Sequence, residues 1–266
     1  MITNNLFDLT GKVALITGGA GLLASEYAIA LHAYGAKIIL ADFNEEKCKN
    51  AVAILAENGT QATAAFCDVT KKDSWENLLK TVLADHKKVD ILINNAGFTN
   101  QSKSANFDAA FEDFPLEDWN AIMNVNLTGA FLGCQVVGKH MVANGKGVII
   151  NIASLYGVVS PNHRIYPGTG ISQPVAYSVS KHGVVALTKY LATLWAEKGV
   201  RVNTLTPGGI FNDHKGLFLE RFEQLIPIGR MSDKTELHGG IVYLASDSSS
   251  HVIGHNLIID GGWTAW

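Results

Sequence analysis

Short apolar runs rich in β-branched residues alternate along the chain with segments whose apolar residues recur at helical intervals. The first run, 12–17, ends at a glycine-rich turn, and Gly35 stops the helical segment that follows. Consecutive parallel strands need a crossover connection, usually a helix, so this alternation predicts a doubly wound parallel sheet with helices on both faces, an α/β fold. Strands are expected at 12–17, 37–42, 61–69, 90–97, 147–154, 200–208 and 256–262, and the main helices at 22–36, up to 57, 119–142, 176–197 and 234–246.

No internal repeat, linker or low-complexity tract interrupts the 266 residues, so one domain over 1–266 is expected. A net charge of −3 gives no footprint for nucleic acid or an anionic membrane, and no apolar run is expected to approach a membrane span. The amino terminus has no basic-then-apolar signal segment. The three scattered cysteines, Cys48, Cys67 and Cys134, are expected to be reduced thiols in the core. These features indicate a soluble, cytoplasmic protein with no nucleic-acid or membrane partner.

The stretch 16–25, ITGGAGLLAS, follows the first expected strand and has the glycine content of a dinucleotide-binding turn. Read as Gly19, Gly21 and Ala24, it fits the G-x-G-x-x-G/A fingerprint of the Rossmann fold. Read from Thr17, it is T-G-x-x-G-x-x-A, a different register. The third position mainly needs close packing of helix on strand, which a methyl group tolerates. The turn therefore indicates a nucleotide site, although a glycine turn alone is a weak motif.

An acidic residue closes the second expected strand. Asp42 lies 18 positions after Ala24, close to the spacing at which a Rossmann carboxylate accepts the ribose hydroxyls. That carboxylate would repel the extra phosphate of NADP, and the next residue, Phe43, is not an arginine that would bind it. NAD is therefore favoured over NADP. The alternative is that Asp42 only caps the following helix.

Tyr177 and Lys181 are four residues apart in an expected helix, so both side chains project from one face. A nearby lysine is expected to lower the pKa of the tyrosine, which makes proton exchange with an alcohol or carbonyl feasible. The pair alone is a frequent accident, but two further polar residues accompany it. Ser154 follows an apolar strand, where its hydroxyl could bond a substrate oxygen, and Asn126 lies in an expected helix.

With these residues in place, the chain resembles the short-chain dehydrogenase/reductase family over nearly its whole length. The order and combination of the shared motifs are highly specific. They are TGGAGLLA at 17–24, CDV at 67–69, NNAG at 94–97, NVNLTGAF at 124–131, NIAS at 151–154, YSVSK at 177–181, PGG at 207–209 and DGG at 260–262. The resemblance implies a Rossmann fold whose amino-terminal part mainly binds the cofactor and whose carboxyl-terminal part supplies catalysis and substrate binding.

The resemblance also implies a catalytic tetrad of Asn126, Ser154, Tyr177 and Lys181. Tyr177 would be the general acid/base and Ser154 would orient the substrate oxygen. Lys181 would lower the tyrosine pKa and hold the nicotinamide ribose, while Asn126 would position a water. The cofactor residues it implies are Gly18, Gly21, Leu22, Leu23, Asp42, Phe43, Asp68, Val69, Asn95, Ala96, Gly97, Tyr177, Lys181, Pro207, Gly208 and Ile210.

Two features depart from the family pattern. The ordinary branch spaces its turn T-G-x-x-x-G-x-G, whereas the register found here is similar to that of the longer, extended branch; chain length and the DGG ending favour the ordinary branch. Asn212 stands where the family commonly has threonine, which puts its contact with the cofactor in doubt.

Two loops are longer than the family's usual ones, 98–115 and 155–176, and loops at this edge of a sheet carry specificity. The second loop is expected to bring His163 and Arg164 to the substrate beside Ser154 and Tyr177, and arginine suits phosphate or carboxylate. The alternative is that both side chains are solvated or contact another subunit. The loop pattern also resembles, more weakly, that of dehydrogenases of surface-polysaccharide and flagellin-glycan pathways.

The sequence therefore predicts an NAD-dependent oxidoreductase that moves hydride between nicotinamide and a polar secondary alcohol or ketone, such as a sugar, polyol or sugar phosphate. A 3-oxoacyl-thioester reductase is the alternative enzyme, and a non-catalytic NAD-binding regulator is the alternative from another class. No histidine spacing suggests a metal site. The family resemblance implies a homo-oligomer, a tetramer or dimer, with Trp263 and Trp266 expected at a subunit interface.

Overall fold

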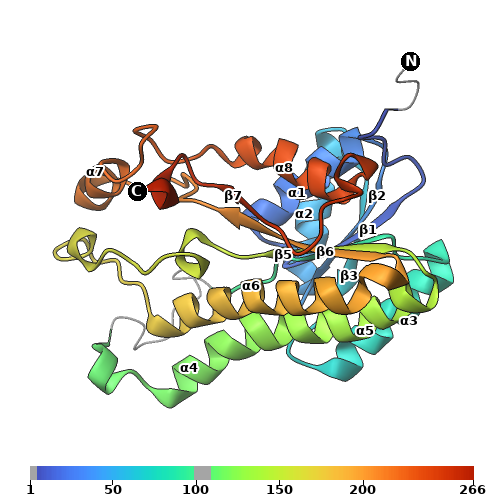
Figure 1. Ribbon diagram of the computed structural model, residues 1–266, viewed down its shortest axis with the longest axis horizontal. Helices are drawn as coiled ribbons and strands as arrows, with labels where there is room; N and C mark the ends of the chain where they lie inside the picture. The colour runs from blue at the N-terminus through green and yellow to red at the C-terminus, as the bar shows by residue number, and fades with distance from the viewer. Residues whose placement is uncertain (1–4, 99–108) are drawn as a thin grey trace.

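The computed structural model describes residues 5–98 and 109–266, in which seven strands form one sheet. All neighbouring strands pair in parallel, in the order β3-β2-β1-β4-β5-β6-β7. The order runs outward from β1 in both directions, so the predicted doubly wound sheet is confirmed (Figure 1). The strands are β1 Val13–Thr17, β2 Lys37–Asp42, β3 Ala62–Phe66, β4 Ile91–Asn94, β5 Gly147–Ile152, β6 Val200–Pro207 and β7 Asn256–Ile259.

Helices cover both faces of the sheet (Figure 1). Buried residues of α1, α2 and α8 share a core cluster with one face, and those of α3, α5 and α6 share a second cluster with the other. Each helix lies between strands in the chain order, which is why the sequence alternates as it does. The helices are α1 Leu22–Ala33, α2 Glu45–Glu57, α3 Lys72–His86, α4 Leu116–Met123, α5 Gly129–Ala143, α6 Val175–Trp195, α7 Gly216–Glu223 and α8 His238–Ala245.

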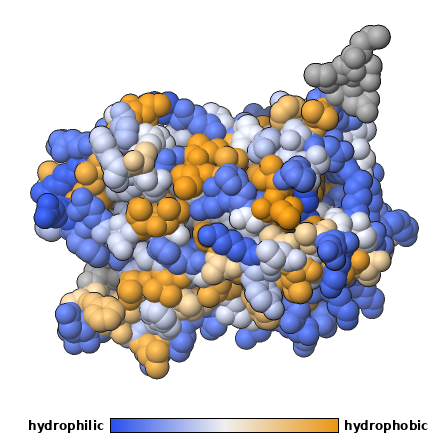
Figure 2. All heavy atoms as spheres, viewed as in Figure 1, coloured by the Kyte–Doolittle hydropathy of each residue, from blue (hydrophilic) through white to orange (hydrophobic). Residues whose placement is uncertain are grey.

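Hydrophobic side chains also reach the surface in separate patches among polar ones (Figure 2). Large exposed apolar side chains on the helical layer include Phe131 of α5 and Tyr190 and Leu194 of α6. On the edge strand β7, Ile258 is partly exposed. Edge strands and apolar helix faces of this kind are available for contact with other chains.

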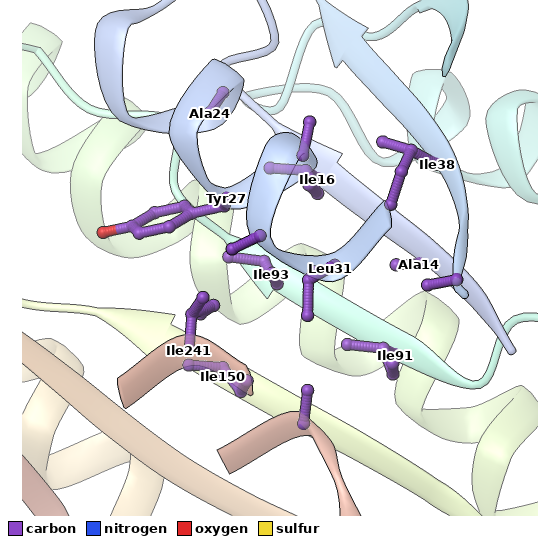
Figure 3. Close-up of a cluster of buried hydrophobic side chains, with 14 of the residues drawn as sticks. Ala14, Ile16, Ala24, Tyr27, Leu31, Ile38, Ile91, Ile93, Ile150 and Ile241 are labelled. Carbon is purple, nitrogen blue, oxygen red and sulfur yellow. The ribbon is translucent and has the colours of Figure 1, made fainter. Parts of the chain in front are cut away.

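Side chains of the central strands point alternately to the two faces. Ala14 and Ile16 of β1 belong to the α1/α8 side, and Val13 and Leu15 belong to the α3/α5/α6 side. Figure 3 shows Ala14 and Ile16 packed with side chains of α1, β2, β4, β5 and α8. Because both faces are buried, these strands read as continuous apolar runs in the sequence.

The stretch Leu116–Ala143 corrects one expectation. It is long and apolar enough, by length and composition alone, to cross a membrane, so an apolar run of that kind does exist. Half of its most apolar part is buried inside the fold, where Val137 and Met141 of α5 pack in the core. Its hydrophobicity is that of a core helix facing the sheet.

The carboxyl ends of the strands meet at one edge of the sheet, where Thr17, Asp42, Asn94, Ile152 and Pro207 end β1, β2, β4, β5 and β6. The connections at this edge carry the motifs singled out above. The sequence did not predict α7, which lies in the connection after β6. Within the long loop after β5 there are two short 3₁₀ turns, Leu155–Gly157 and His163–Ile165. Of the loop after β4, residues 99–108 lie outside the described residues.

Candidate active site

The glycine turn between β1 and α1 has a shape that side chains would block. Gly18 has φ +68°, and a Cβ there would lie 2.9 Å from Ala96 Cα on the neighbouring β4 connection. A Cβ on Gly19 would lie 2.8 Å from Leu40 Cβ of β2. Gly21 is the N-cap of α1, and no side chain of the described residues caps that helix end. The first N–H groups of α1 are therefore open to an anion, which fits the pyrophosphate of a dinucleotide.

The next three residues continue this turn into the core. Leu22 is partly exposed at the start of α1, Leu23 packs against the core, and Ala24 is fully buried within it. Figure 3 shows Ala24 on α1 above β1. The structure thus places Ala24 where the helix packs on the sheet, as the T-G-x-x-G-x-x-A register predicts.

Asp42 lies beside this turn. Its carboxylate accepts hydrogen bonds from the backbone N–H of Ala20 at 3.1 Å and of Asn44 at 2.9 Å. It therefore braces the glycine turn. The N-cap of α2 is Asn44, whose side chain accepts from the Lys47 N–H, so the alternative that Asp42 caps that helix is wrong. Each oxygen of the Asp42 carboxylate keeps lone pairs that a ribose hydroxyl could use. Phe43 is exposed next to it.

The residues expected near the adenine are held by bonds of their own. The Asp68 carboxylate accepts from the N–H of Thr70 at 3.0 Å and from its hydroxyl at 2.7 Å. The Val69 carbonyl accepts from Trp75 Nε1 at 3.0 Å, and the Val69 side chain is buried. A Cβ on Gly129 would lie 2.9 Å from Val69 Cγ2, so this glycine allows α5 to approach the β3 connection.

The NNAG segment is tied to the end of β1. Thr17 Oγ1 accepts from the backbone N–H groups of Asn95 and Ala96, each at 3.1 Å, and Asn95 Nδ2 donates to the Thr17 carbonyl at 2.9 Å. A Cβ on Gly97 would meet no atom closer than 3.7 Å, with Asn126 Oδ1 and Lys181 Nζ both at 3.8 Å. Gly97 therefore lies in van der Waals range of both Asn126 and Lys181, between the end of β4 and the expected catalytic residues.

Asn126 lies in a π-helical turn, Asn124–Thr128, between α4 and α5. It is buried, its Oδ1 accepts from the Phe98 N–H at 2.6 Å, and its Nδ2 donates to Ser180 Oγ at 3.1 Å. Ser180 Oγ in turn donates to the Tyr177 carbonyl at 2.7 Å. Turns of this kind inside helices are frequent at functional sites, because they re-aim a side chain.

The other three expected catalytic residues converge on the end of β5. Ser154 follows that strand, its Oγ accepts from the Tyr156 N–H at 3.2 Å, and its side chain lowers the pKa of Tyr177. Lys181 Nζ is buried, donates to the Ile152 carbonyl at 2.9 Å and lies 5.7 Å from the centroid of the Tyr177 ring. The structure thus brings the four residues of the expected tetrad together.

Burial dominates the electrostatics of this cluster. It raises the pKa of the Tyr177 phenol above its usual value, and the hydrogen bond with Ser154 opposes that rise. Burial lowers the pKa of Lys181 to about 8. Lys181 is not among the causes of the Tyr177 shift, so the lowering of the Tyr177 pKa by this lysine stays a prediction.

The connection after β6 forms the opposite wall. A Cβ on Gly208 would lie 2.6 Å from Asp260 Cα, so a side chain at this position would clash with the DGG segment. Ile210 forms a parallel bridge with Ser232, whose N–H donates to the Gly209 carbonyl at 2.8 Å. Pro207 ends β6 just before this wall.

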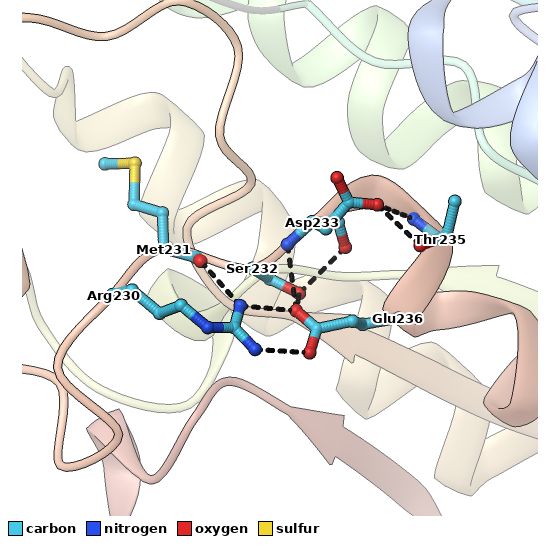
Figure 4. A network of polar contacts seen from close by, with 6 residues as sticks. All are labelled: Arg230, Met231, Ser232, Asp233, Thr235 and Glu236. Atoms are coloured by element: carbon cyan, nitrogen blue, oxygen red, sulfur yellow. Dashed lines mark hydrogen bonds and ion pairs between the residues drawn. The ribbon is translucent and has the colours of Figure 1, made fainter.

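A polar network fixes the Ser232 segment (Figure 4). Arg230 makes two bonds of 2.7 Å with the Glu236 carboxylate, and that carboxylate accepts from the N–H of Asp233. Asp233 also caps the 3₁₀ turn Lys234–Leu237. The pair holds the pKa of Glu236 down at about 2, so the network stays ionised under ordinary conditions. Asn212, beyond this bridge, is exposed and its N–H donates to His214 Nδ1.

His163 and Arg164 are not brought into the tetrad. His163 is exposed and lines a pocket of about 830 Å³ together with Ser178 and His182, on a face of α6 next to the one that carries Tyr177. The Arg164 side chain is exposed and makes no polar contact with another described residue; its backbone N–H donates to Asn162 Oδ1. Both are surface residues of the loop in this structure.

The expectation for Trp263 is wrong. Its indole is buried inside the chain and lies 4.3 Å from the ring of Phe222 on α7, so it packs behind the site and is not left for a subunit interface. Trp266 is 77% exposed.

Sequence reasoning missed the aromatic residues of this region. Tyr156 and Tyr166 hydrogen-bond to each other at 2.6 Å, and Phe218 and Phe222 lie i, i+4 on α7. The signal was present: Phe218 and Phe222 have helical spacing, and both tyrosines lie inside the loop already singled out as longer than usual. Over residues 5–98 and 109–266, no group of three or more histidine, cysteine or acidic side chains could hold a metal ion.

Comparisons with known proteins agree with this architecture. Residues 20–264 match the family described as "Enoyl-(Acyl carrier protein) reductase". The D-threitol dehydrogenase of Mycolicibacterium smegmatis is 36% identical over 263 residues, which cover 97% of this chain and 95% of that protein.

Two solved structures are similar along their whole length. A short-chain type dehydrogenase/reductase from Mycobacterium marinum has a TM-score of 0.86 and 34% identity, with 98% of both chains covered. A gluconate 5-dehydrogenase from Burkholderia cenocepacia J2315, in complex with NADP and tartrate, has a TM-score of 0.84 and 33% identity, again with 98% of both chains covered.

Proposed function

Because the chain belongs to the short-chain dehydrogenase/reductase family and is an NAD(P)-dependent oxidoreductase that acts on CH–OH groups, we propose that it interconverts a secondary alcohol of a polyol or sugar with the corresponding ketone. The observation that carries the proposal is the cluster of Ser154, Tyr177 and Lys181 at the end of β5, where the buried ammonium of Lys181 lies 5.7 Å from the ring of the partly buried Tyr177. The D-threitol and gluconate dehydrogenases among its relatives support a polyhydroxylated substrate.

Each of the four tetrad residues has its own role in the proposed reaction. Ser154 holds the substrate oxygen next to the Tyr177 hydroxyl, and Tyr177 takes the hydroxyl proton during oxidation and returns it during reduction. Lys181 places a positive charge near the phenol while it is ionised. Asn126, fixed between Phe98 and Ser180, orients a water that passes the proton on. The nicotinamide cofactor, when bound, supplies the hydride acceptor or donor.

The cofactor lies along the carboxyl edge of the sheet in this proposal. The N–H groups after Gly21 bind its pyrophosphate, and Asp42 and Phe43 face the adenosine ribose. Asp68, Val69 and the Asn95–Gly97 segment line the adenosine side, and Lys181, Pro207, Gly208 and Ile210 line the nicotinamide side. A carboxylate at position 42, with no arginine beside it, favours NAD over NADP. The related gluconate 5-dehydrogenase was solved in complex with NADP, so the affinities of this enzyme for the two dinucleotides are to be measured directly.

A 3-oxoacyl-thioester reductase is the second candidate, favoured by the acyl-carrier-protein substrate in the description of the matching family. It requires a channel for a long acyl-pantetheine chain. A non-catalytic regulator has less support, because such a protein has no need of both Tyr177 and Lys181. For the enzyme as a whole, we propose one functional domain over 1–266, a cytoplasmic location suited to its three free buried cysteines, and a homo-oligomer.

A substrate panel with the purified enzyme tests the proposal. D-threitol, glycerol, D-arabinitol and D-gluconate are oxidised with NAD or NADP, acetoacetyl thioesters are reduced with the reduced cofactors, and absorbance at the NADH band is followed. We expect turnover of at least one polyol or sugar acid, at least about a hundredfold less with Tyr177→Phe, and little with the thioester. Efficient turnover of the thioester alone would establish the second candidate, and binding of NADH without any turnover would favour the regulator.

A further inference from the structure

Two tyrosine hydroxyls face each other beside the catalytic cluster. Tyr156 Oη and Tyr166 Oη are 2.6 Å apart. Tyr156 lies two residues after Ser154, and Tyr166 lies ten residues further on, in the long loop that separates Ser154 from Tyr177. This bond therefore joins the added loop to the end of the strand that carries the catalytic serine.

Tyr166 is held from several directions. Its carbonyl accepts from the Thr169 N–H at 3.0 Å and from the Thr169 hydroxyl at 2.7 Å. Arg221 of α7 donates to the carbonyl of the next residue, Pro167, at 2.6 Å. The Tyr166 ring stacks on Phe218 of α7, with centroids 6.1 Å apart and planes at 25°. A side chain fixed by this many neighbours has a set position, as groups that recognise a ligand need.

The fixed phenol lies in the same cluster as the catalytic one. Tyr156 belongs to a hydrophobic cluster that also contains Phe218 and Phe222 of α7, and Tyr166 and Tyr177 both pack against it, partly buried. Burial is the main cause that raises the pKa of Tyr166 to about 12, and the charge of Tyr177 adds to the rise. Tyr166 therefore stays protonated wherever the enzyme works, and its hydroxyl serves as a hydrogen-bond group.

The hydrogen-bond capacity of the pair is only partly used. Each phenol has one O–H donor, and one of the two donors is consumed by the bond between them. The other O–H remains available in either direction of that bond. Tyr156 is only 6% exposed, whereas Tyr166 also lines the pocket beside α6, so Tyr166 is the better placed to offer it to a bound molecule.

We infer that Tyr166 is a specificity-determining residue whose hydroxyl binds a second hydroxyl group of the substrate. A hydroxyl both accepts and donates, so it matches the free O–H of one tyrosine and the remaining lone pairs of the pair. A substrate with only the reacting oxygen leaves this polar group unpaired, which is how a site built for a hydroxyl rejects an analogue without it. The inference rests on the proposed function and names the feature of a polyol that the enzyme recognises.

The test compares Tyr166→Phe with the wild type on two ketones that differ in one hydroxyl. Acetoin carries a hydroxyl next to its carbonyl, and 2-butanone does not; both dissolve well enough for kcat/KM to be read from initial slopes of NADH oxidation. We expect Tyr166→Phe to lower kcat/KM for acetoin about tenfold to a hundredfold and to change that for 2-butanone less than about twofold. The Kd for NADH should stay the same. The Tm should fall, because the buried Tyr156 hydroxyl loses its partner, but the protein should still fold, because phenylalanine keeps the stacking on Phe218.

Tyr190→Phe is the matched control, since this phenol is 67% exposed on α6 and should alter neither substrate. If Tyr166→Phe fails to fold, Tyr156→Phe breaks the same hydrogen bond from its other end. This variant should lower the kcat/KM for acetoin relative to that for 2-butanone. An equal loss on both ketones, or no loss on acetoin, overturns the inference. A wild-type enzyme inactive on acetoin and on every polyol of the panel contradicts the proposed function itself and removes the inference with it.

Discussion

Lys181 Nζ donates a hydrogen bond to the main-chain carbonyl of Ile152, 2.9 Å away at the end of β5. The bond fixes the ammonium between the strand that leads to Ser154 and the helix that carries Tyr177. Among the described residues, this carbonyl is the one hydrogen-bond acceptor of that ammonium, which is buried and has no carboxylate partner. Burial of a cation on these terms is unfavourable, and it lowers the Lys181 pKa from 10.5 to about 8.

Replacing Lys181 by methionine should therefore stabilise the fold while it damages the enzyme. Between about pH 8 and 10.5 the unfolded chain holds the lysine proton and the folded chain does not, so the penalty is full below pH 8 and fades as pH rises toward 10.5. The shift corresponds to about 3 kcal/mol, and loss of the bond to Ile152 offsets about 1 kcal/mol. We expect Lys181→Met to raise the free energy of unfolding by about 2 kcal/mol at pH 7.

Urea unfolding of both proteins at pH 7, 9 and 10 measures this difference, which should shrink as the pH rises. Lys189→Met is the control, because Lys189 is exposed on the same helix and should give no pH-dependent difference. A Lys181→Met protein less stable than the wild type at pH 7 would show that the buried ammonium contributes more through its contacts than its desolvation costs.

Tyr177→Phe should abolish proton exchange and leave the fold intact. The phenyl ring keeps its packing, but the hydroxyl bonded to Ser154 is lost, so we expect turnover to fall at least about a hundredfold with the Kd for NADH unchanged. Because burial raises the pKa of the phenol, oxidation by the wild type should still be rising with pH above neutrality. Any residual turnover of the variant should lack that rise. Near-normal turnover would mean that another group carries the proton.

Asp42→Asn tests the choice of dinucleotide. The wild type should bind NADH more tightly than NADPH, because the carboxylate repels the additional phosphate. The variant removes the charge and one of the two acceptors that brace Ala20 and Asn44, so affinity for both dinucleotides should fall. The informative quantity is the Kd for NADPH divided by the Kd for NADH. We expect this ratio to be roughly tenfold smaller in the variant than in the wild type, a difference of about 1.4 kcal/mol. Asp85→Asn, at an exposed residue of α3, is the control, and equal affinities in the wild type would contradict an NAD preference.

The strands and their order could be predicted because their residues are buried on both faces. Runs such as 37–42 contain mostly apolar β-branched and aliphatic residues, and the observed β2 has those same bounds. The tetrad could be placed at one edge for a related reason, since each of its motifs follows or faces the carboxyl end of a strand.

What the sequence could not give depends on tertiary packing. The pKa of Tyr177 is set by how deeply the phenol is buried, which the four-residue spacing to Lys181 does not reveal. Trp263 lies near the end of the chain, which suggested that its indole contacts another subunit. In the structure Phe222 of α7 packs against this indole. The apolar character of Leu116–Ala143 became interpretable only when the sheet beneath it was known.

The register of the glycine turn gives the last prediction. If Ala24 lies where the cofactor is held, Ala24→Gly should restore the missing glycine and tighten NADH binding. The structure places Ala24 in the first turn of α1, and its side chain is fully buried among core side chains. Glycine inside a helix costs about 1 kcal/mol relative to alanine, and loss of a buried methyl adds up to about 0.8 kcal/mol. We therefore expect Ala24→Gly to lower the free energy of unfolding by about 1–2 kcal/mol and to change the Kd for NADH less than about twofold. Ala33→Gly, at the exposed end of the same helix, should cost only a few tenths of a kcal/mol by comparison. Urea unfolding and NADH titration of the three proteins decide between the two outcomes, and tighter NADH binding by Ala24→Gly would show that position 24 is part of the phosphate site.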